Sequence, residues 1–500
     1  MLSNFNSAFA FIVCLFASSN LKAQADTVYL AFEDVLKIAQ ESSYLATNSR
    51  LAWEANSAQL KIYKLSNLPS LKLNTTVPNF TQSISTVTQP DGIDAFVTRN
   101  QANSSLSLSL VQPIVFTGGN LSISGNINRI DLFGSNQQVS YSSAPFNLSY
   151  GQSLFNYNPY FDQKKANSLK EQKLIFEFTQ ALENINVQAS KLYFNLYMSQ
   201  VRYHLASQNL SHFGKLLKIA KEQLDAARIS EIDFTQIELS LLDAQLEKKK
   251  SNANIFTAEL ALKKFLKMPK GQLLRVFENT SVPALQMDKE KILTQAESIN
   301  KLTNSDIRKI ESKINFNQGY NKLITSDVSL SLGTNSSSAD FDNLFNNLQQ
   351  RQSISFTLKM PIFDWGLRKE QNNVTKMKWD LDIQKIIEDY NGFEIELLDD
   401  ISTIEEAQEY SELCKKTIAL CERQIQQMQE VFKSGKIPFS DLVRVINKRS
   451  EVYLTLVNNC DLFWEKLFSI RSKSLYDPIS QSMVELRTPS RVPFVETMAK

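Results

Sequence analysis

The sequence is poor in residues that interrupt regular structure and in residues that do chemistry. Its 500 residues include 13 glycines, 13 prolines, 4 cysteines and 2 histidines. So few breakers imply long uninterrupted elements. The two histidines, His204 and His212, fall on one predicted helix, where surface or packing roles are more common than metal binding.

Motifs typical of enzyme active sites are also missing from the sequence. It contains no glycine-rich phosphate loop, paired-cysteine zinc motif or nucleophile elbow. We therefore expect no enzyme activity, no cofactor and no bound metal. The charge balance argues against a nucleic-acid-binding protein. The 54 basic and 52 acidic residues leave a formal net charge of +2, which gives no whole-chain field that attracts nucleic acid.

Long apolar runs are absent after residue 25, where no stretch approaches the roughly 20 residues of a transmembrane helix. The apolar run from Ala8 to Ala17 is followed by Ala23-Gln24-Ala25. This pattern predicts a secretory signal peptide over residues 1–25. Cys14 lies in the run without the context of lipid attachment, so we expect it to be removed with the signal.

Two long stretches, 162–226 and 368–434, contain no proline and one glycine each. As helices, each would extend about 100 Å. Apolar residues step by four and three from Phe178 to Leu196, and again from Leu442 to Ile470. This spacing predicts coiled-coil packing, and an ordinary amphipathic helix of period 3.6 is the alternative.

Segments of alternating polarity lie between the predicted helices, and the alternation is strict at 106–110, 328–332 and 354–358. Serine, threonine and asparagine fill most of the polar positions. The pattern fits a barrel that is apolar toward lipid and polar toward its lumen, and it also fits a soluble two-sheet sandwich. The segments are 71–77, 106–110, 121–127, 146–150, 328–332 and 354–358.

The chain repeats itself once. Ile229 matches Ile437 and Asp233 matches Asp441, 208 residues apart, whereas earlier matches such as Leu73 with Leu330 are 257 residues apart. We assign residues 26–287 to the first repeat, 288–476 to the second and 477–500 to a C-terminal tail. The difference in spacing predicts an extra hairpin of about residues 111–150 in the first repeat, with its strands either in the sheet or outside it.

The order helix, strands, long helix, tight turn and returning helix, twice over, resembles the TolC-like outer-membrane factor family from Val28 to Tyr476. The segment from Met360 to Arg368 is similar to the family's strand-to-helix junction, carried by Pro361, Phe363 and Gly366. The segment 434–441 is similar to the turn between the family's descending and returning helices.

The resemblance implies an α+β membrane channel of two tandem repeats, with long coiled-coil helices and strands that contribute to a trimeric outer-membrane barrel. It implies a homotrimer in outer-membrane lipid, a periplasmic helical tunnel, and a passive role in tripartite efflux or type I secretion. A periplasmic adaptor and an inner-membrane pump would be its partners. The adaptor would contact the hairpin tips at Ala227, Arg228, Ile229, Ser230, Asp233, Gly435, Lys436, Ile437 and Pro438.

Asp441 and Arg444 lie just after the second tip, where the family often places an acidic ring that narrows the periplasmic mouth. The resemblance therefore implies a periplasmic gate in which Asp441 contacts a neighbour's Arg444. The alternative is that Asp441 is a first-turn charge favoured by the helix dipole and Arg444 a solvated side chain. A periplasmic coiled-coil adaptor or a filamentous scaffold is the alternative for the chain as a whole.

Three cysteines remain after the signal. Cys414 and Cys421 are seven residues apart on one predicted helix, about 10 Å, too far for a disulfide. Cys414 and Cys460 are equally distant from the turn at Ile437, so an antiparallel hairpin brings them to one height. The sequence leaves two alternatives, a disulfide between Cys414 and Cys460 or three buried free thiols.

Overall fold

The computed structural model describes residues 27–134, 137–269, 271–320 and 322–489. The predicted signal peptide and the end of the predicted tail lie outside these ranges. The chain divides into two compact units, one of Met1–Trp53, Ile175–Asn300 and Gly392–Lys500, the other of Glu54–Leu174 and Lys301–Asn391. Each unit draws segments from both predicted repeats.

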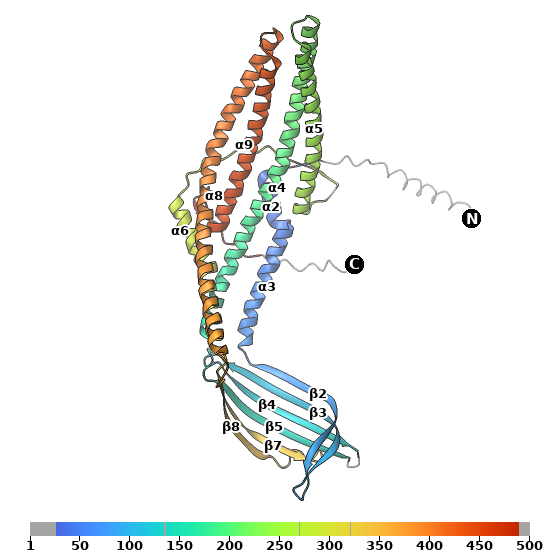
Figure 1. Ribbon diagram of the computed structural model, residues 1–500, viewed down its shortest axis with the longest axis vertical. Coiled ribbons are helices and arrows are strands. Elements are labelled where there is room, and N and C mark those ends of the chain that lie inside the picture. Colours follow the sequence, from blue (N-terminus) through green and yellow to red (C-terminus); the bar gives the residue numbers. More distant parts are fainter. Residues whose placement is uncertain (1–26, 135–136, 270, 321, 490–500) are drawn as a thin grey trace, which may run out of the picture. The chain divides into compact units, whose positions relative to one another are not determined.

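Six antiparallel strands form one sheet in the order β2-β3-β4-β5-β7-β8 (Figure 1). All six alternating segments predicted from the sequence lie in these strands. Both strands of the predicted extra hairpin, β4 and β5, are part of the sheet, and β5 pairs with β7 of the second half of the chain. The strands are β2 Ser70–Thr88, β3 Asp94–Ile114, β4 Gly119–Phe133, β5 Gln138–Ser153, β7 Thr325–Ser338 and β8 Gln349–Lys359.

Two of the three prolines inside the strands, Pro78 and Pro145, coincide with irregularities of the ladder, whereas Pro113 near the end of β3 pairs in regular register with Asn120. The register shifts between Thr76 and Asn79 of β2, around Pro78, and again on β5 at Pro145 against both neighbouring strands. Proline cannot donate to a ladder and is tolerated at such bulges. The sheet therefore accommodates both prolines without losing the pairing beyond them.

Two long helices follow the breaker-free stretches, as predicted: α4 Tyr160–Asp225 and α8 Leu367–Lys433. The helices α5 Glu231–Leu266 and α9 Phe439–Ser474 return from them. The predicted apolar seam of α4 is buried, with Ile185 and Ala189 at most 1% exposed. On α9, Leu467 and Ile470 are fully buried. Packing of these seams forms the hydrophobic clusters of the helical unit.

Shorter elements complete the two units. Strand β1 pairs in parallel with β6, and Tyr193 of α4 donates to the carbonyl of Phe277 just after β6 at 2.7 Å. Phe32 of α2 packs edge-on against Tyr193. The elements are β1 Thr27–Leu30, α2 Phe32–Ser42, α3 Tyr44–Ser66, β6 Leu273–Val276, α6 Lys289–Asn300, the π-helix η1 Lys301–Ser305, α7 Asp306–Gly319, β9 Tyr476–Asp477 and β10 Ser482–Met483.

A buried ion cluster joins α8 to α9. The Asp400 carboxylate accepts from Lys466 at 2.7 Å and from Lys473 at 2.8 Å, and its side chain is 5% exposed. Ser469 donates a third hydrogen bond at 2.7 Å. Since a buried carboxylate is costly without partners, these contacts are needed to keep Asp400 ionised in the core.

No helix in the described part of the chain combines the length and the apolarity needed to cross a membrane.

Candidate functional site

The two hairpin tips have the same backbone geometry. In the turn from α8 to α9, Gly435 has a φ of 73° and donates to the carbonyl of Phe432 at 2.9 Å. In the turn from α4 to α5, Ala227 has a φ of 52° and donates to Leu224 at 2.9 Å. In each turn the next amide reaches back five residues, which completes a Schellman motif.

Ala227 ends its helix as completely as Gly435 does. Alanine stands at this position in the first tip, where the second tip has glycine. The structure keeps both hydrogen bonds, and the difference is instead a left-handed backbone at a residue with a Cβ, which costs about 1–2 kcal/mol. The tip of the first hairpin is therefore strained rather than uncapped.

The helices that leave the two tips begin differently. Ser230 and Asp233 form a reciprocal capping box at the start of α5. The equivalent cap of α9 is Pro438, which has no amide hydrogen to donate to Asp441. Asp441 instead accepts from Arg444 on the next turn of the same helix at 3.3 Å, and the Arg444 side chain is 78% exposed.

Gln223 ties the two hairpins together below the tips. Its side-chain amide, buried in α4, donates to the carbonyls of Phe432 and Lys433 at 2.9 and 3.2 Å. These carbonyls lie at the end of α8, where helical partners run out. Sequence reasoning missed Gln223, although it continues the apolar spacing of Phe213, Leu216 and Ala220 and is therefore a polar residue at a seam position.

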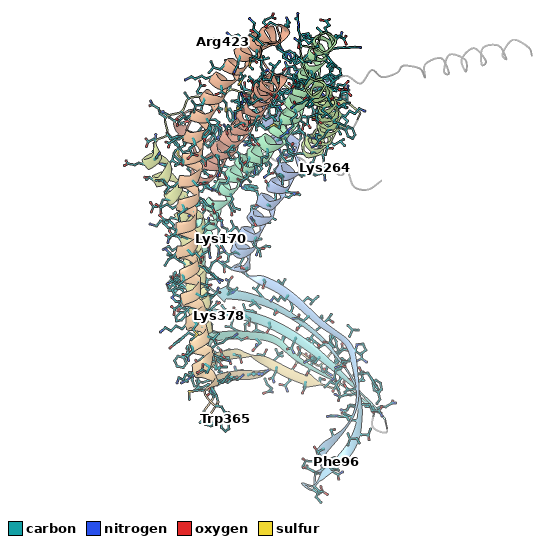
Figure 2. The ribbon with its side chains drawn as sticks, turned by 45° about the horizontal axis from the view of Figure 1, so that its top comes forward. Phe96, Lys170, Lys264, Trp365, Lys378 and Arg423 are labelled. Carbon is teal, nitrogen blue, oxygen red and sulfur yellow. The ribbon has the colours of Figure 1, made fainter. Side chains whose placement is uncertain are left out.

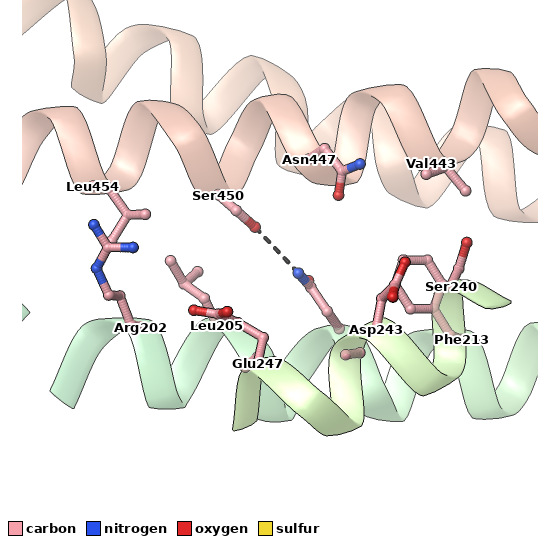
Figure 3. Close-up of a pocket in the computed structure, with 13 residues that line it drawn as sticks. Arg202, Leu205, Phe213, Ser240, Asp243, Glu247, Val443, Asn447, Ser450 and Leu454 are labelled. Carbon is pink, nitrogen blue, oxygen red and sulfur yellow. Dashed lines mark hydrogen bonds between the residues drawn. The ribbon is translucent and has the colours of Figure 1, made fainter. Parts of the chain in front are cut away.

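A cleft of about 220 Å³ lies between α4, α5 and α9 (Figure 3). Asn209 of α4 spans it by donating to Ser450 of α9 at 3.3 Å, the dashed line in Figure 3. Asn209 also accepts from Arg449 at 3.1 Å. Asp243 and Glu247 of α5 line the cleft, which gives it an acidic side.

The predicted strand-to-helix junction is a tight, exposed turn. Gly366 has a φ of 86°, and Trp365 before it has a φ of 54°. Asp364, which the motif did not single out, accepts from the amides of Gly366 at 3.0 Å and Arg368 at 2.9 Å and so caps α8. Phe363 packs edge-on against Trp365, and Trp365 is 90% exposed at the start of α8 (Figure 2).

One face of the sheet is apolar across all six strands. In the strand pairing, Leu73 lies opposite Leu108, Leu110 opposite Ile123 and Leu330 opposite Ile354, all on the same side of the sheet. Residues of this face are between 38% and 81% exposed: Leu71, Leu73, Leu106, Leu108, Leu110, Ile123, Phe146, Leu330, Leu332, Ile354, Phe356 and Leu358. A patch of this extent is typical of an interaction surface or a lipid-facing surface.

The histidines and cysteines that the structure describes do not form a chemical centre. Within the described ranges, no three His, Cys, Asp or Glu side chains cluster as a metal site. Cys414, Cys421 and Cys460 are buried free thiols, and Cys414 and Cys460 lie in one hydrophobic cluster. Burial raises the pKa of Cys460 to about 12, which keeps this thiol protonated and unreactive at neutral pH.

Comparison with solved structures places this architecture among known folds. The outer-membrane channel OprN superposes with a TM-score of 0.62 at 12% identity, over 88% of this chain and 89% of OprN. CusC, a protein that forms a transmembrane channel, gives 0.61 at 11% identity over 91% and 95%. The chain has the fold of an outer-membrane channel.

The CmeC outer-membrane channel of Campylobacter jejuni shares this channel fold, with a TM-score of 0.58 at 14% identity over 88% of this chain and 85% of CmeC. No family model and no curated protein matches the sequence. The α+β fold implied by the resemblance to TolC-like factors is confirmed.

Proposed function

We propose that the chain is the outer-membrane channel of an export system, with the sheet in the outer membrane and the helices in the periplasm. The exposed apolar face of the six-stranded sheet carries this proposal most strongly, because it suits contact with lipid while the opposite face is polar. The channel fold supports the same conclusion. Solutes would pass passively, and the chain would not act as an enzyme.

A homotrimer would complete the channel. Within the described residues, β2 and β8 each have one strand neighbour, and unpaired strand edges are not tolerated in lipid. Pairing β8 of one chain with β2 of the next would close eighteen strands into a barrel, six from each chain. Such a ring uses a head-to-tail interface that closes after three copies.

The helices carry complementary surfaces for the same ring. On α5 an exposed apolar stripe repeats with coiled-coil spacing: Ile232, Leu239, Leu242, Leu246, Phe256 and Leu260, each at least 41% exposed. Helix α8 has a second exposed stripe that includes Leu413 and Leu420, 52% and 61% exposed. We place the α5 stripe of one chain against the α8 stripe of the next.

Cysteine cross-linking tests the trimer. The residues to be replaced are Leu242 on α5 and Leu420 on α8, which lie equally far along the chain from the turn residues Ala227 and Gly435. The substitutions are Leu242→Cys and Leu420→Cys. The double variant is expected to give dimer and trimer bands on unreduced gels of outer-membrane fractions, because neighbouring α5 and α8 would meet. Either single variant serves as the control and should give no ladder. A double variant that stays at monomer mass, or a chain recovered as a soluble periplasmic monomer, would contradict the proposal.

The tips would bind a periplasmic adaptor that connects the channel to an inner-membrane pump. The residues that turn the chain there, Ala227 to Ser230 and Gly435 to Pro438, with Asp233 beside them, stand between the ends of the paired helices. A periplasmic adaptor or a filamentous scaffold fits less well. The described chain has two helical hairpins in tandem, and its sheet presents a broad apolar face.

We place the periplasmic gate at Asp441 and Arg444. The two side chains pair within one helix. In the trimer, contacts of Asp441 with a neighbour's Arg444, repeated three times around a narrow mouth, would restrict ion flow. Arg444→Ala is expected to raise single-channel conductance in planar bilayers. Lys448→Ala is the matched control, because Lys448 forms a similar exposed pair with Glu451 on the same helix. If neither Arg444→Ala nor Asp441→Ala changes conductance, Asp441 is only a first-turn helix charge.

A further inference from the structure

The polar face of the sheet is unusually poor in carboxylates. The strand pairing places five charged side chains on this face of the described strands: Lys72, Arg99, Arg351, Lys359 and Asp327. Hydroxyl and carboxamide side chains make up most of the rest, among them Asn74, Ser105, Ser107, Ser109, Ser122, Ser124, Asn147, Ser149, Ser329, Ser331, Ser353 and Ser355. Basic groups therefore outnumber acidic groups four to one.

The single carboxylate on this face is already balanced. Asp327 accepts a hydrogen bond from Ser153 of the neighbouring strand. It pairs with Thr357 in the ladder, while Thr325, two residues earlier, pairs with Lys359. Asp327 and Lys359 are therefore diagonal neighbours on one face, close enough for their charges to offset each other. Lys72, Arg99 and Arg351 have no carboxylate beside them on this face.

Two of the unbalanced cations lie at the two ends of one row. The ladder connects Lys72 to Ser109, Ser124, Asn147, Gly333 and Arg351 across all six strands. The residues between the two cations are small and uncharged. On the apolar face of the described strands the only basic residue, Arg129, is by contrast neutralised by Asp131 at 2.7 Å.

We infer that the polar face is a hydroxyl-rich, weakly basic wall that favours neutral and anionic solutes over cationic ones. Hydroxyl and amide groups exchange hydrogen bonds with a passing solute without holding it, and the unpaired cations raise the local concentration of anions. The inference rests on the proposed function, since this face has to line the water-filled pore.

Charged thiol reagents measure the potential at this wall directly. Ser331→Cys places a thiol on the polar face, where Ser331 pairs with Ser353 and is a diagonal neighbour of Arg351. The anionic reagent (2-sulfonatoethyl) methanethiosulfonate and the cationic reagent [2-(trimethylammonium)ethyl] methanethiosulfonate are applied to full-length protein in liposomes. The rate at which each reagent modifies the protein thiol is divided by its rate with a free thiol in solution, which corrects for the reagent's own reactivity. The wild-type chain gives the background, because its described cysteines are buried.

The anionic reagent is expected to react faster after this correction, by about threefold, because a unit charge at a diagonal position about 7–8 Å away acts through screened water. Adding Arg351→Gln should bring the ratio close to one. Arg129→Gln removes the same charge from the opposite face and should leave the ratio unchanged. A ratio that favours the cationic reagent, or that does not change with Arg351→Gln, overturns the inference without contradicting the proposed pore. A Ser331→Cys thiol that neither reagent reaches contradicts the proposed pore itself.

Discussion

Replacing Asp400 with asparagine is expected to lower the free energy of unfolding of the protein by about 3 kcal/mol. The substitution keeps the shape of the side chain but removes the charge that Lys466 and Lys473 share, and both lysine side chains are only 21% exposed. Lys466 and Lys473 would then keep only exposed carboxylates as partners, Asp399 and Glu396 respectively. Chemical denaturation of the detergent-solubilised protein, followed by circular dichroism, measures the loss.

Asp399→Asn is the matched control for this substitution. Asp399 is the preceding residue and also contacts Lys466, at 3.1 Å, but its side chain is 68% exposed. Exposed ion pairs contribute at most about 1 kcal/mol, so Asp399→Asn should have little effect on unfolding. Equal losses in the two variants would show that burial of Asp400 does not set the strength of the cluster.

Acidification offers a second measurement on the same cluster. Burial by itself raises the pKa of Asp400, but hydrogen bonds from Lys466 and Lys473 outweigh burial and hold the pKa below its usual value. A folded pKa below the unfolded value, about 4, stabilises the fold above that pH, and the stabilisation is lost as pH falls through the folded pKa. The difference between wild type and Asp400→Asn should therefore shrink below about pH 4.

Gly333→Val is expected to disrupt the sheet at the β5 bulge. A Cβ at Gly333 would stand 2.4 Å from the carbonyl oxygen of Phe146 and 2.9 Å from the Cα of Asn147. Both contacts are with backbone, which cannot rotate away. On the other side of the bulge, a Cβ at Gly125 would stand 2.7 Å from the carbonyl oxygen of Pro145. Two glycines thus allow both neighbouring strands to approach the bulge.

The cost of Gly333→Val should be about 3 kcal/mol, the upper end for overpacking, because opening β5 from β7 also breaks ladder hydrogen bonds. Samples are heated to a series of temperatures before electrophoresis, and the temperature at which the assembled form dissociates measures the effect. Gly151→Val is the control, since a Cβ there meets nothing within 4 Å in the same sheet. If both variants lose the same stability, strand propensity rather than close approach limits Gly333.

The local elements were predictable because each depends on nearby residues. Alternation with period two identified segments of all six strands of the sheet, and the breaker-free stretches identified α4 and α8. The 208-residue offset placed equivalent turns at Ala227 and Gly435, and the structure gives them the same pair of hydrogen bonds. Pro78 and Pro145 could have indicated the two bulges, since proline inside a strand pattern is typical of that irregularity.

The residues of the candidate site could be predicted only in part from local sequence patterns. The tip, gate and junction residues came from the family resemblance, and their functional roles remain predictions. Gln223 and Asp364 were missed because their importance depends on carbonyl and amide groups at helix ends, which lack the regular α-helical hydrogen bond. A sequence shows that such groups exist, but it does not show which side chain reaches them.

The sequence by itself determined the faces of residues in the six alternating segments, the seams of α4 and α9 and the two-repeat plan, because these follow from local periodicity and from the internal repeat. Only the tertiary structure decided that β5 pairs with β7, and hence that both repeats share one sheet. It also decided that Lys72 and Arg351 stand on one row. Periodicity fixes which way a side chain faces, whereas the identity of its neighbour is set by pairing between segments that are far apart in the chain.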